Sequence, residues 1–255
     1  MRVLLLVIIN IFVFNLIKAQ INPRDSSVKA PLLAATVTGQ FPYADMGKRF
    51  GYNTSVGAAF INKSKKGWIW GVDINFMFGN KIKEDSILNK IATHPDKNGN
   101  IYILSSEGKL TTPRMWERGI YSHFSFGKML YKVGPNSNCG FFATFGIGGL
   151  YHHIRIEDIG NSSPQLSKDY RKGYDRLSYG ISINQFVGYM FLHSRKYVNF
   201  FIGIEVIEGF TKNRRGFNYD TMLSDDATRT DILMGCKAGF IFPLYKKVPN
   251  QFYYY

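Results

Sequence analysis

The residues best suited to nucleophilic chemistry are His123 and Ser125, which lie two positions apart. Neighbouring residues of a β-strand point to opposite faces, so residues two apart share a face. A histidine on the same face as a serine can act as the base that activates the hydroxyl for attack on an ester. The pair is therefore a candidate hydrolytic site, provided that the segment around it is a strand.

Other stretches that suggest chemistry fail on geometry or composition. His152 and His153 are adjacent, so on a strand they point to opposite faces and cannot bind one metal ion. No predicted helix follows the glycine-rich stretch 146–149, and the turn at 96–99 has too few acids for a calcium loop. The sequence contains no P-loop, GxSxG or HExxH motif either, so we expect no metal and no cofactor.

Eight segments of the chain have the alternation or composition of strands. In 68–79 every second residue is bulky and apolar, from Trp68 to Phe78, and Asp73 and Asn75 lie between them. Most segments exceed the ~5–6 residues of a soluble strand, and a tilted membrane strand needs ~9–11. The segments are 32–40, 52–62, 68–79, 118–130, 139–156, 177–192, 198–210 and 228–242.

The connections between these segments alternate in length, short after every even-numbered segment and longer after every odd-numbered one. Short turns on one side and long loops on the other are typical of outer-membrane barrels. The sequence therefore predicts an all-β fold, an eight-stranded antiparallel up-and-down transmembrane β-barrel over 32–242. Trp68 would face lipid and Asp73 the interior. A soluble secreted barrel of the lipocalin type is the alternative.

The two ends of the chain have different expected fates. One arginine, an apolar stretch and Ala19 form the layout of a signal peptide at 1–19. A single N-terminal membrane anchor is the alternative, but Asn10 and Asn15 interrupt the stretch. An even number of strands places both termini on the turn side. Residues 20–31 and 243–255 are therefore expected in the periplasm, with the barrel in the outer membrane of a Gram-negative bacterium.

The interior of an eight-stranded barrel is just wide enough for side chains to fill, so we expect it to be closed. Asp73, Glu205 and Lys237 fall on inward positions near mid-strand, where an unpaired charge is costly. We expect these charges to pair with one another, with Asn75 and His123 alongside. An ion or proton path is the alternative.

Two places break the alternation of the predicted strands. Gln185 falls on an outward position, and the pattern shifts around Gly148–His152, so we expect β-bulges at both. Cys139 and Cys236 lie on the fifth and eighth segments, which are not neighbours in an up-and-down ring. We therefore expect no disulfide between them.

The formal net charge of +14 is concentrated on the turn side, where no acid accompanies the cations. The cations would contact membrane phosphates, with docking of an acidic periplasmic partner as the alternative. We expect no binding to nucleic acid, because exported barrels rarely meet it. The predicted periplasmic basic face consists of Lys63, Lys65, Lys66, Lys132, Arg195, Lys196, Lys246 and Lys247, with Lys128 beside it.

The segment 167–180 is the most distinctive predicted loop because it combines tyrosines with charges of both signs. An aromatic belt with local ion pairs would account for it, and a ligand or partner epitope is the alternative. The predicted extracellular patch consists of Tyr170, Arg171, Lys172, Tyr174, Asp175 and Arg176.

Taken together, these features resemble the small outer-membrane β-barrel proteins of Bacteroidota-type bacteria. The resemblance rests on the Lys-Ala-Gln cleavage region, the eight segments, and KAGFIFPL at 237–244, which is similar to the β-signal read by barrel-assembly machinery. It departs from that signal by continuing for eleven residues to the chain end. The resemblance implies a non-enzymatic structural or accessory protein, in some members part of a secretion or barrel-assembly machine. Its partners would be outer-membrane lipids and a periplasmic or membrane protein.

The element formed by His123 and Ser125 also resembles the His-x-Ser element of outer-membrane lipid A deacylases, which are eight-stranded barrels too. That resemblance implies a lipid-modifying enzyme as the alternative function. In that family the element lies near the C-terminus, faces lipid and is followed by an asparagine. Here it lies on the fourth segment, is expected to face inward, and is followed by Phe126.

Overall fold

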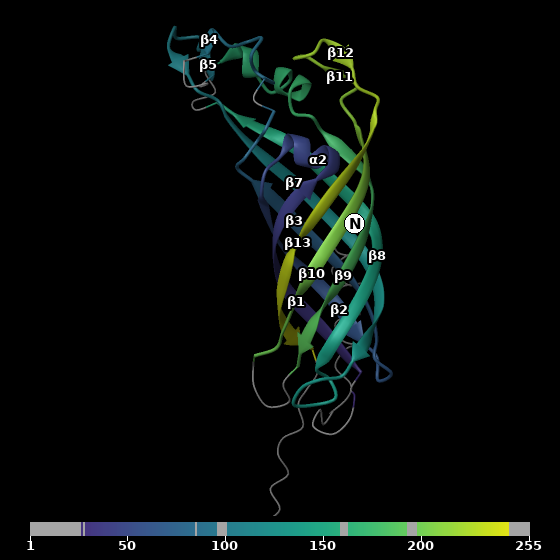
Figure 1. Cartoon of the computed structure of the whole chain (residues 1–255). Coiled ribbons are helices and arrows are strands. Elements are labelled where there is room, and N and C mark those ends of the chain that lie inside the picture. The colour runs from purple at the N-terminus through teal and green to yellow at the C-terminus, as the bar shows by residue number, and fades with distance from the viewer. Residues whose placement is uncertain are drawn as a thin grey trace, which may run out of the picture.

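The computed structural model describes residues 27, 29–84, 86–95, 101–158, 163–192 and 198–244. Eight long strands form one closed ring (Figure 1), which confirms the predicted antiparallel up-and-down barrel. Each strand pairs with the next along the chain, and the last pairs with the first. The ring consists of β1 (Ala30–Tyr43), β2 (Asn53–Lys63), β3 (Trp68–Gly79), β7 (Arg114–Tyr131), β8 (Gly140–Glu157), β9 (Ser178–Phe191), β10 (Phe200–Asn213) and β13 (Thr228–Pro243).

The ring therefore begins two residues before the predicted start at 32 and ends one residue after the predicted end at 242. The expected signal peptide at 1–19 and the stretch to residue 26 lie outside the described residues, as does the tail from 245 onward.

Burial alternates residue by residue along β3. Ile74 is 58% exposed, whereas its neighbour Asp73 is 8% exposed. A pleated strand in a barrel has one face toward the interior and the other toward the surroundings. The bulky face of β3 is therefore outside and its polar face inside, the reverse of a soluble barrel.

Large apolar side chains cover the outside of every strand of the ring. In water so continuous an apolar surface would drive association, whereas in a bilayer it provides the required contact with acyl chains. Ring closure also pairs the backbone groups of all strand edges, as a hydrocarbon surrounding demands. Examples are Val37, Val56, Ile74, Phe124, Phe145, Ile181, Ile204 and Phe240, one from each strand. Among the described residues, no helix is long and apolar enough to cross a membrane.

Buried side chains fill the barrel interior in layers along its axis. On β3, Ile69 belongs to an apolar cluster near the short turns, which also holds Phe186 and Phe201. Met77, at the other end of β3, belongs to a second apolar cluster near the long loops. Asp73 lies between the two on the same inward face. A polar layer therefore separates two apolar layers.

The connections of the ring alternate in length as predicted. Those at 64–67, 132–139 and 192–199 are short, and those at 44–52, 80–113, 158–177 and 214–227 are long. The long loops gather toward the upper end of the barrel in Figure 1. They contain α2 (Ala44–Arg49), β4 (His94–Pro95), β5 (Ile101–Leu104), β6 (Leu110–Thr111), η1 (Pro164–Leu166), η2 (Tyr170–Gly173), β11 (Phe217–Asn218) and β12 (Leu223–Ser224).

The prediction of β-bulges at Gly148–His152 and at Gln185 is wrong. The pairing of β8 runs without interruption through Gly148–His152, and that of β9 runs through Gln185. The register shift recorded in the ring lies between Met129 and Tyr131 on β7. Gln185 stays on the outer face, where its Nε2 donates to Glu208 Oε1 at 3.3 Å. Because these two outward polar side chains bond to each other, Gln185 can stay on the outer face without a bulge to turn it inward.

Cys139 and Cys236 are both free thiols, which confirms that they form no disulfide. Cys139 is buried just before β8, whereas Cys236 is exposed on the outer face of β13. The two strands are not neighbours in the ring, so the up-and-down order keeps the thiols apart.

Candidate functional site: a buried charge network and ion-paired loops

Lys237 on β13 joins two carboxylates inside the barrel. Its Nζ lies 2.7 Å from Glu205 Oε1 on β10 and 3.0 Å from Asp73 Oδ2 on β3. The side chains of all three residues point inward, and each residue is at most 8% exposed. The chain thus places three of the sequence-predicted interior residues in mutual contact, from strands on different sides of the ring.

Neutral groups satisfy the remaining atoms of this trio. Asn75 donates to Asp73, and Asn184 Nδ2 donates to Glu205 Oε1 at 2.7 Å. Thr36 Oγ1 in turn donates to Asn75 Oδ1 at 2.9 Å. A buried ion pair stabilises a fold only when further hydrogen bonds offset the desolvation of its charges. Residues from β1, β3 and β9 supply those bonds here, so together with the trio the network links five strands across the lumen.

His123 lies beside the trio, but its partner is not Ser125. His123 Nε2 lies 2.9 Å from Ser182 Oγ on β9, and its Nδ1 lies 3.7 Å from Asp73 Oδ1, too far for a hydrogen bond. His123 is 1% exposed and Ser182 is fully buried. Ser182 is not among the residues predicted from the sequence, although its inward parity on β9 is a usable signal.

A cavity of about 70 Å³ lies on the turn side of the trio. Its walls are mostly apolar and include Ile61, Phe142 and Phe201, while Ser125 and Lys237 border it as well. A void of this size has room for a few water molecules. Ser125 borders this space, but the His123 ring bonds to Ser182 rather than to Ser125, so the predicted pair is not assembled.

Lys63 does not belong to the predicted basic face. It points into the turn end of the barrel, is 1% exposed, and its Nζ donates to Asn138 Oδ1 at 2.9 Å and Ser27 Oγ at 3.1 Å. The position follows from the alternation of β2, because every second residue of this strand points inward and Lys63 is one of them.

The other cations of the predicted basic face divide into two groups. Lys65, Lys66 and Lys132 are exposed on the turn side, and Lys128 Nζ lies 5.1 Å from the centroid of the Trp68 ring. An ammonium over an aromatic face is a favourable contact at a membrane boundary. Arg195, Lys196, Lys246 and Lys247 lie outside the described residues.

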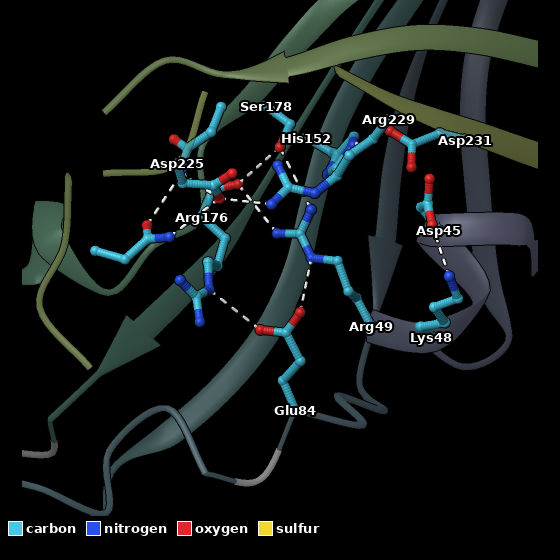
Figure 2. Close-up of polar contacts among 12 residues, drawn as sticks. Asp45, Lys48, Arg49, Glu84, His152, Arg176, Ser178, Asp225, Arg229 and Asp231 are labelled. Atoms are coloured by element: carbon cyan, nitrogen blue, oxygen red, sulfur yellow. Dashed lines mark hydrogen bonds and ion pairs between the residues drawn. The ribbon is translucent and has the colours of Figure 1, made fainter. Parts of the chain in front are cut away.

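A chain of ion pairs connects all four long loops, and Figure 2 shows its part from Arg49 through Glu84 to Arg176. Arg49 Nε in the first loop lies 3.0 Å from Glu84 Oε1 in the second. Glu84 Oε2 accepts from Arg176 Nε in the third loop at 3.2 Å, and Arg176 Nη2 contacts Asp220 in the fourth. We call this set, Arg49, Glu84, Arg176 and Asp220, the loop chain. Its four side chains are at most 24% exposed, so bulk water screens these pairs less than surface pairs.

The predicted patch at 170–176 is only partly exposed. Tyr170 and Lys172 face solvent and Arg171 is half-buried, whereas Tyr174 and Asp175 are buried. The patch is therefore mainly a junction between loops rather than an open epitope. Arg176 has a φ of 51°, a strained value for a residue with a side chain. Its contacts to two other loops account for that conformation.

Further ion pairs strengthen the same end of the barrel. Arg215 Nε lies 3.0 Å from Asp175 Oδ1, and this hydrogen bonding raises the pKa of the Arg215 guanidinium. Burial alone would raise the pKa of Asp225, but hydrogen bonds from Arg229, Asn213 and Asn218 lower it below the ordinary value. Asp225 therefore remains a carboxylate at neutral pH and keeps its pairing with Arg229.

His152 and His153 point to opposite faces, as adjacent strand residues must. His152 Nε2 lies 2.9 Å from Asp231 Oδ2 inside the barrel. Thr211 also donates to that carboxylate. The described residues contain no group of three His, Cys, Asp or Glu side chains placed to hold a metal ion.

Removal of the ammonium from the trio provides a test of its role. In Lys237→Met two carboxylates remain buried without their cation, so we expect a loss of about 3–5 kcal/mol in unfolding free energy. Urea or thermal unfolding in detergent measures it. Lys66→Met, at an exposed turn position, should change stability by less than about 0.5 kcal/mol. Adding Glu205→Gln to Lys237→Met should restore part of the loss. Equal midpoints for Lys237→Met and Lys66→Met would contradict this role.

Disruption of the loop chain should loosen loops that are distant in sequence. Arg176→Gln removes the cation that joins Glu84 to Asp220, and a charge-assisted hydrogen bond is worth about 1.5–3 kcal/mol. We expect amide hydrogen exchange in 80–95 and 214–227 to rise on the order of tenfold. Lys172→Gln is the matched control, because the partner of Lys172 is the neighbouring Asp169. Unchanged exchange in both distant loops would show that the pairs do not hold them.

No family model and no curated protein matches the chain. Similar solved structures include neisserial surface protein A, at 11% identity and a TM-score of 0.38, covering 82% of this chain and 95% of that one. The attachment invasion locus protein Ail of Yersinia pestis has 7% identity and a TM-score of 0.41, with 84% and 98% covered. The outer membrane protein OprG of Pseudomonas aeruginosa has 12% identity and a TM-score of 0.38, with 86% and 98% covered. At such low values the likeness adds no argument. The chain is a closed eight-stranded β-barrel because its own strand pairing makes it one.

Proposed function

We propose that this chain is a non-enzymatic protein of a Gram-negative outer membrane, a closed barrel that holds its four long loops in fixed positions for binding outside the cell. The observation that carries the proposal is the loop chain, because it connects every long loop through partly buried ion pairs. Loops that are already ordered lose less entropy when a partner binds.

The outer surface of the ring supports the membrane location. Apolar side chains cover all eight strands, and closed barrels of this kind span outer membranes. The alternation of short and long connections supports loops outside and both termini in the periplasm. The β-signal-like stretch 237–244, whose first part forms the end of β13, supports assignment to the Bacteroidota type.

The interior favours a closed scaffold over a channel or an enzyme. The Lys237 trio occupies mid-barrel, and apolar clusters fill the lumen on both sides of it. His123 is buried and its ring bonds to Ser182 rather than to Ser125, so the lipid-modifying alternative lacks a base beside its nucleophile.

A more specific role as an accessory of a secretion or barrel-assembly machine would use the turn side. Lys65, Lys66 and Lys132 are exposed there and would attract an acidic periplasmic partner or membrane phosphates. The loop side carries the loop chain, so we favour the loops as the main binding region.

The closed interior predicts an absence of ion conduction. We expect the purified protein to insert into planar bilayers without stepwise currents, under conditions in which a porin of known conductance gives them. Insertion would be verified by heat-modifiable gel migration of protein recovered from the same vesicles. Sustained currents that depend on protein concentration would contradict the closed scaffold and favour the ion-path alternative.

The orientation predicts display of the loops on the cell surface. Gly108 lies in an exposed turn with a φ of +74° and open space around it, so an epitope inserted there should not disturb the barrel. We expect antibody to label intact cells that carry this insertion. An epitope inserted between Lys65 and Lys66 in the opposite turn should be labelled only after permeabilisation. The reverse pattern would contradict the proposed orientation.

A further inference from the structure

A hollow of about 290 Å³ lies among the loops, outside the loop chain. One residue comes from the turn between β5 and β6, and the others come from η1 and the residues on either side of it. Both segments belong to the loop end of the barrel (Figure 1). The hollow is lined by Ser106, Ser163, Pro164, Leu166, Ser167, Lys168 and Arg171.

The polar lining of this hollow is rich in hydrogen-bond donors. It contains three hydroxyls, one ammonium and one guanidinium, and none of the described residues that line it is a carboxylate. The nearby acids already have cations of their own, because Glu107 pairs with Lys109 and Asp169 pairs with Lys172. Lys168 and Arg171 form no ion pair within the part of the chain that the structure describes. The hollow therefore presents positive charge without a counter-charge in its walls.

Arg171 is held in place by the barrel itself. Its Nη1 donates to the backbone oxygen of Ile156 at the end of β8, at 3.2 Å. That contact uses one donor of the guanidinium and leaves its other N–H groups for an incoming anion. A side chain fixed in this way loses less conformational entropy on binding than a free arginine.

Ser163 supplies an independent sign of a ligand. It is 4% exposed, and its Oγ has no hydrogen-bond partner among the described residues. Its backbone is fixed on both sides, since its N–H donates to Asp158 Oδ2 at 2.7 Å and its carbonyl accepts from Leu166 at 3.0 Å. Leaving a buried hydroxyl unsatisfied costs about 1–3 kcal/mol. A ligand oxygen in the hollow would satisfy it.

Asp158 accepts a hydrogen bond from the backbone of Ser163 and is not among the residues that line the hollow. Thr111 Oγ1 donates to its Oδ1 at 3.0 Å, so neutral donors contact both of its oxygens. Lys168 and Arg171 together outweigh its single negative charge. The net field in the hollow therefore favours an anion.

We propose that this hollow binds a monosaccharide that carries a phosphate or sulfate group. Arginine and lysine match the oxyanion, and the serine hydroxyls match sugar hydroxyls. Pro164 and Leu166 offer an apolar wall for one face of the sugar ring. The volume corresponds to the lower end of small-molecule sites. A peptide would need an extended groove or a free strand edge, and the hollow is neither. This inference rests on the proposed function, because it requires loops outside the cell.

Calorimetric titration of the full chain in detergent tests this site. The probes are glucose 6-phosphate, glucose 6-sulfate and glucose. We expect saturable binding of both esters, weakening as salt is raised, and no detectable binding of glucose. Lys168→Gln combined with Arg171→Gln should weaken binding by at least about tenfold, and Ser163→Ala by about threefold to tenfold. Lys66→Gln, exposed in a turn at the opposite end of the barrel, should stay within about twofold of the parent.

Two results would overturn the inference. One is the absence of saturable ester binding by protein that migrates as a folded barrel. The other is unchanged ester binding in the Lys168→Gln, Arg171→Gln variant. Neither result bears on the proposed function, which the conductance and surface-labelling experiments test without this site. If the esters do not bind but the loops are labelled on intact cells, only the sugar-ester site in the hollow is rejected.

The source of the sugar ester can be identified in the same assay. The titration is repeated in lipid nanodiscs with and without lipopolysaccharide. Weaker apparent affinity for glucose 6-phosphate in the lipopolysaccharide discs would assign the site to a membrane-borne sugar phosphate. Equal affinity in both discs would assign it to a soluble ligand. Both outcomes support binding, and they differ only in where the ligand resides.

Discussion

The ammonium of Lys237, held between Glu205 and Asp73, is the contact on which the closed interior depends. The surroundings of this barrel are apolar, so its charged groups are placed in the lumen, where water is scarce. An isolated charge there would be expensive, and a network with its hydrogen bonds satisfied offsets much of that cost. Because the three residues come from separate strands, the same contact fixes the lumen and joins opposite sides of the ring.

The loop end of the barrel uses the same kind of interaction, one charged side chain between two of the opposite sign, outside the bilayer. Glu84 is placed between Arg49 and Arg176 much as Lys237 is placed between two acids, with the signs reversed. Each bridging residue therefore has two partners from different segments. In the lumen this arrangement joins strands, whereas above the lumen it joins loops. Ion pairs and an apolar cluster that includes the loop residues Ile87, Leu88 and Leu166 therefore both order the loop end.

The strand assignments could be predicted because strand periodicity is a local property. The alternation in residues 68–79 shows two unlike faces, and the lengths of the connections indicate which topology orders the strands. Counting charge by segment predicts Lys63 on the basic turn face, although the parity of its own strand places it inside. For Gln185, the missing information was an outward partner on the next strand, Glu208.

Contacts between segments far apart in the chain could not be predicted. The bond between His123 and Ser182 depends on the shear of the ring, and a period of two carries no information about shear. The loop chain depends on how four irregular segments fold back on one another, and the positive φ of Arg176 has no sequence signal of its own. Likewise, the hollow beside η1 depends on a turn almost sixty residues earlier in the chain, at Ser106.

The pairing of β1 with β13 has a consequence for how the chain folds. In this pairing Leu32 lies opposite Pro243, so the two ends of the ring meet only after the whole intervening chain is present. The entropy of closing so long a loop must be lost before the final row of hydrogen bonds compensates it. Until that moment both edge strands remain open and able to pair with another chain. Completion of the last strand is therefore the step at which an aggregation-prone intermediate becomes a protected barrel.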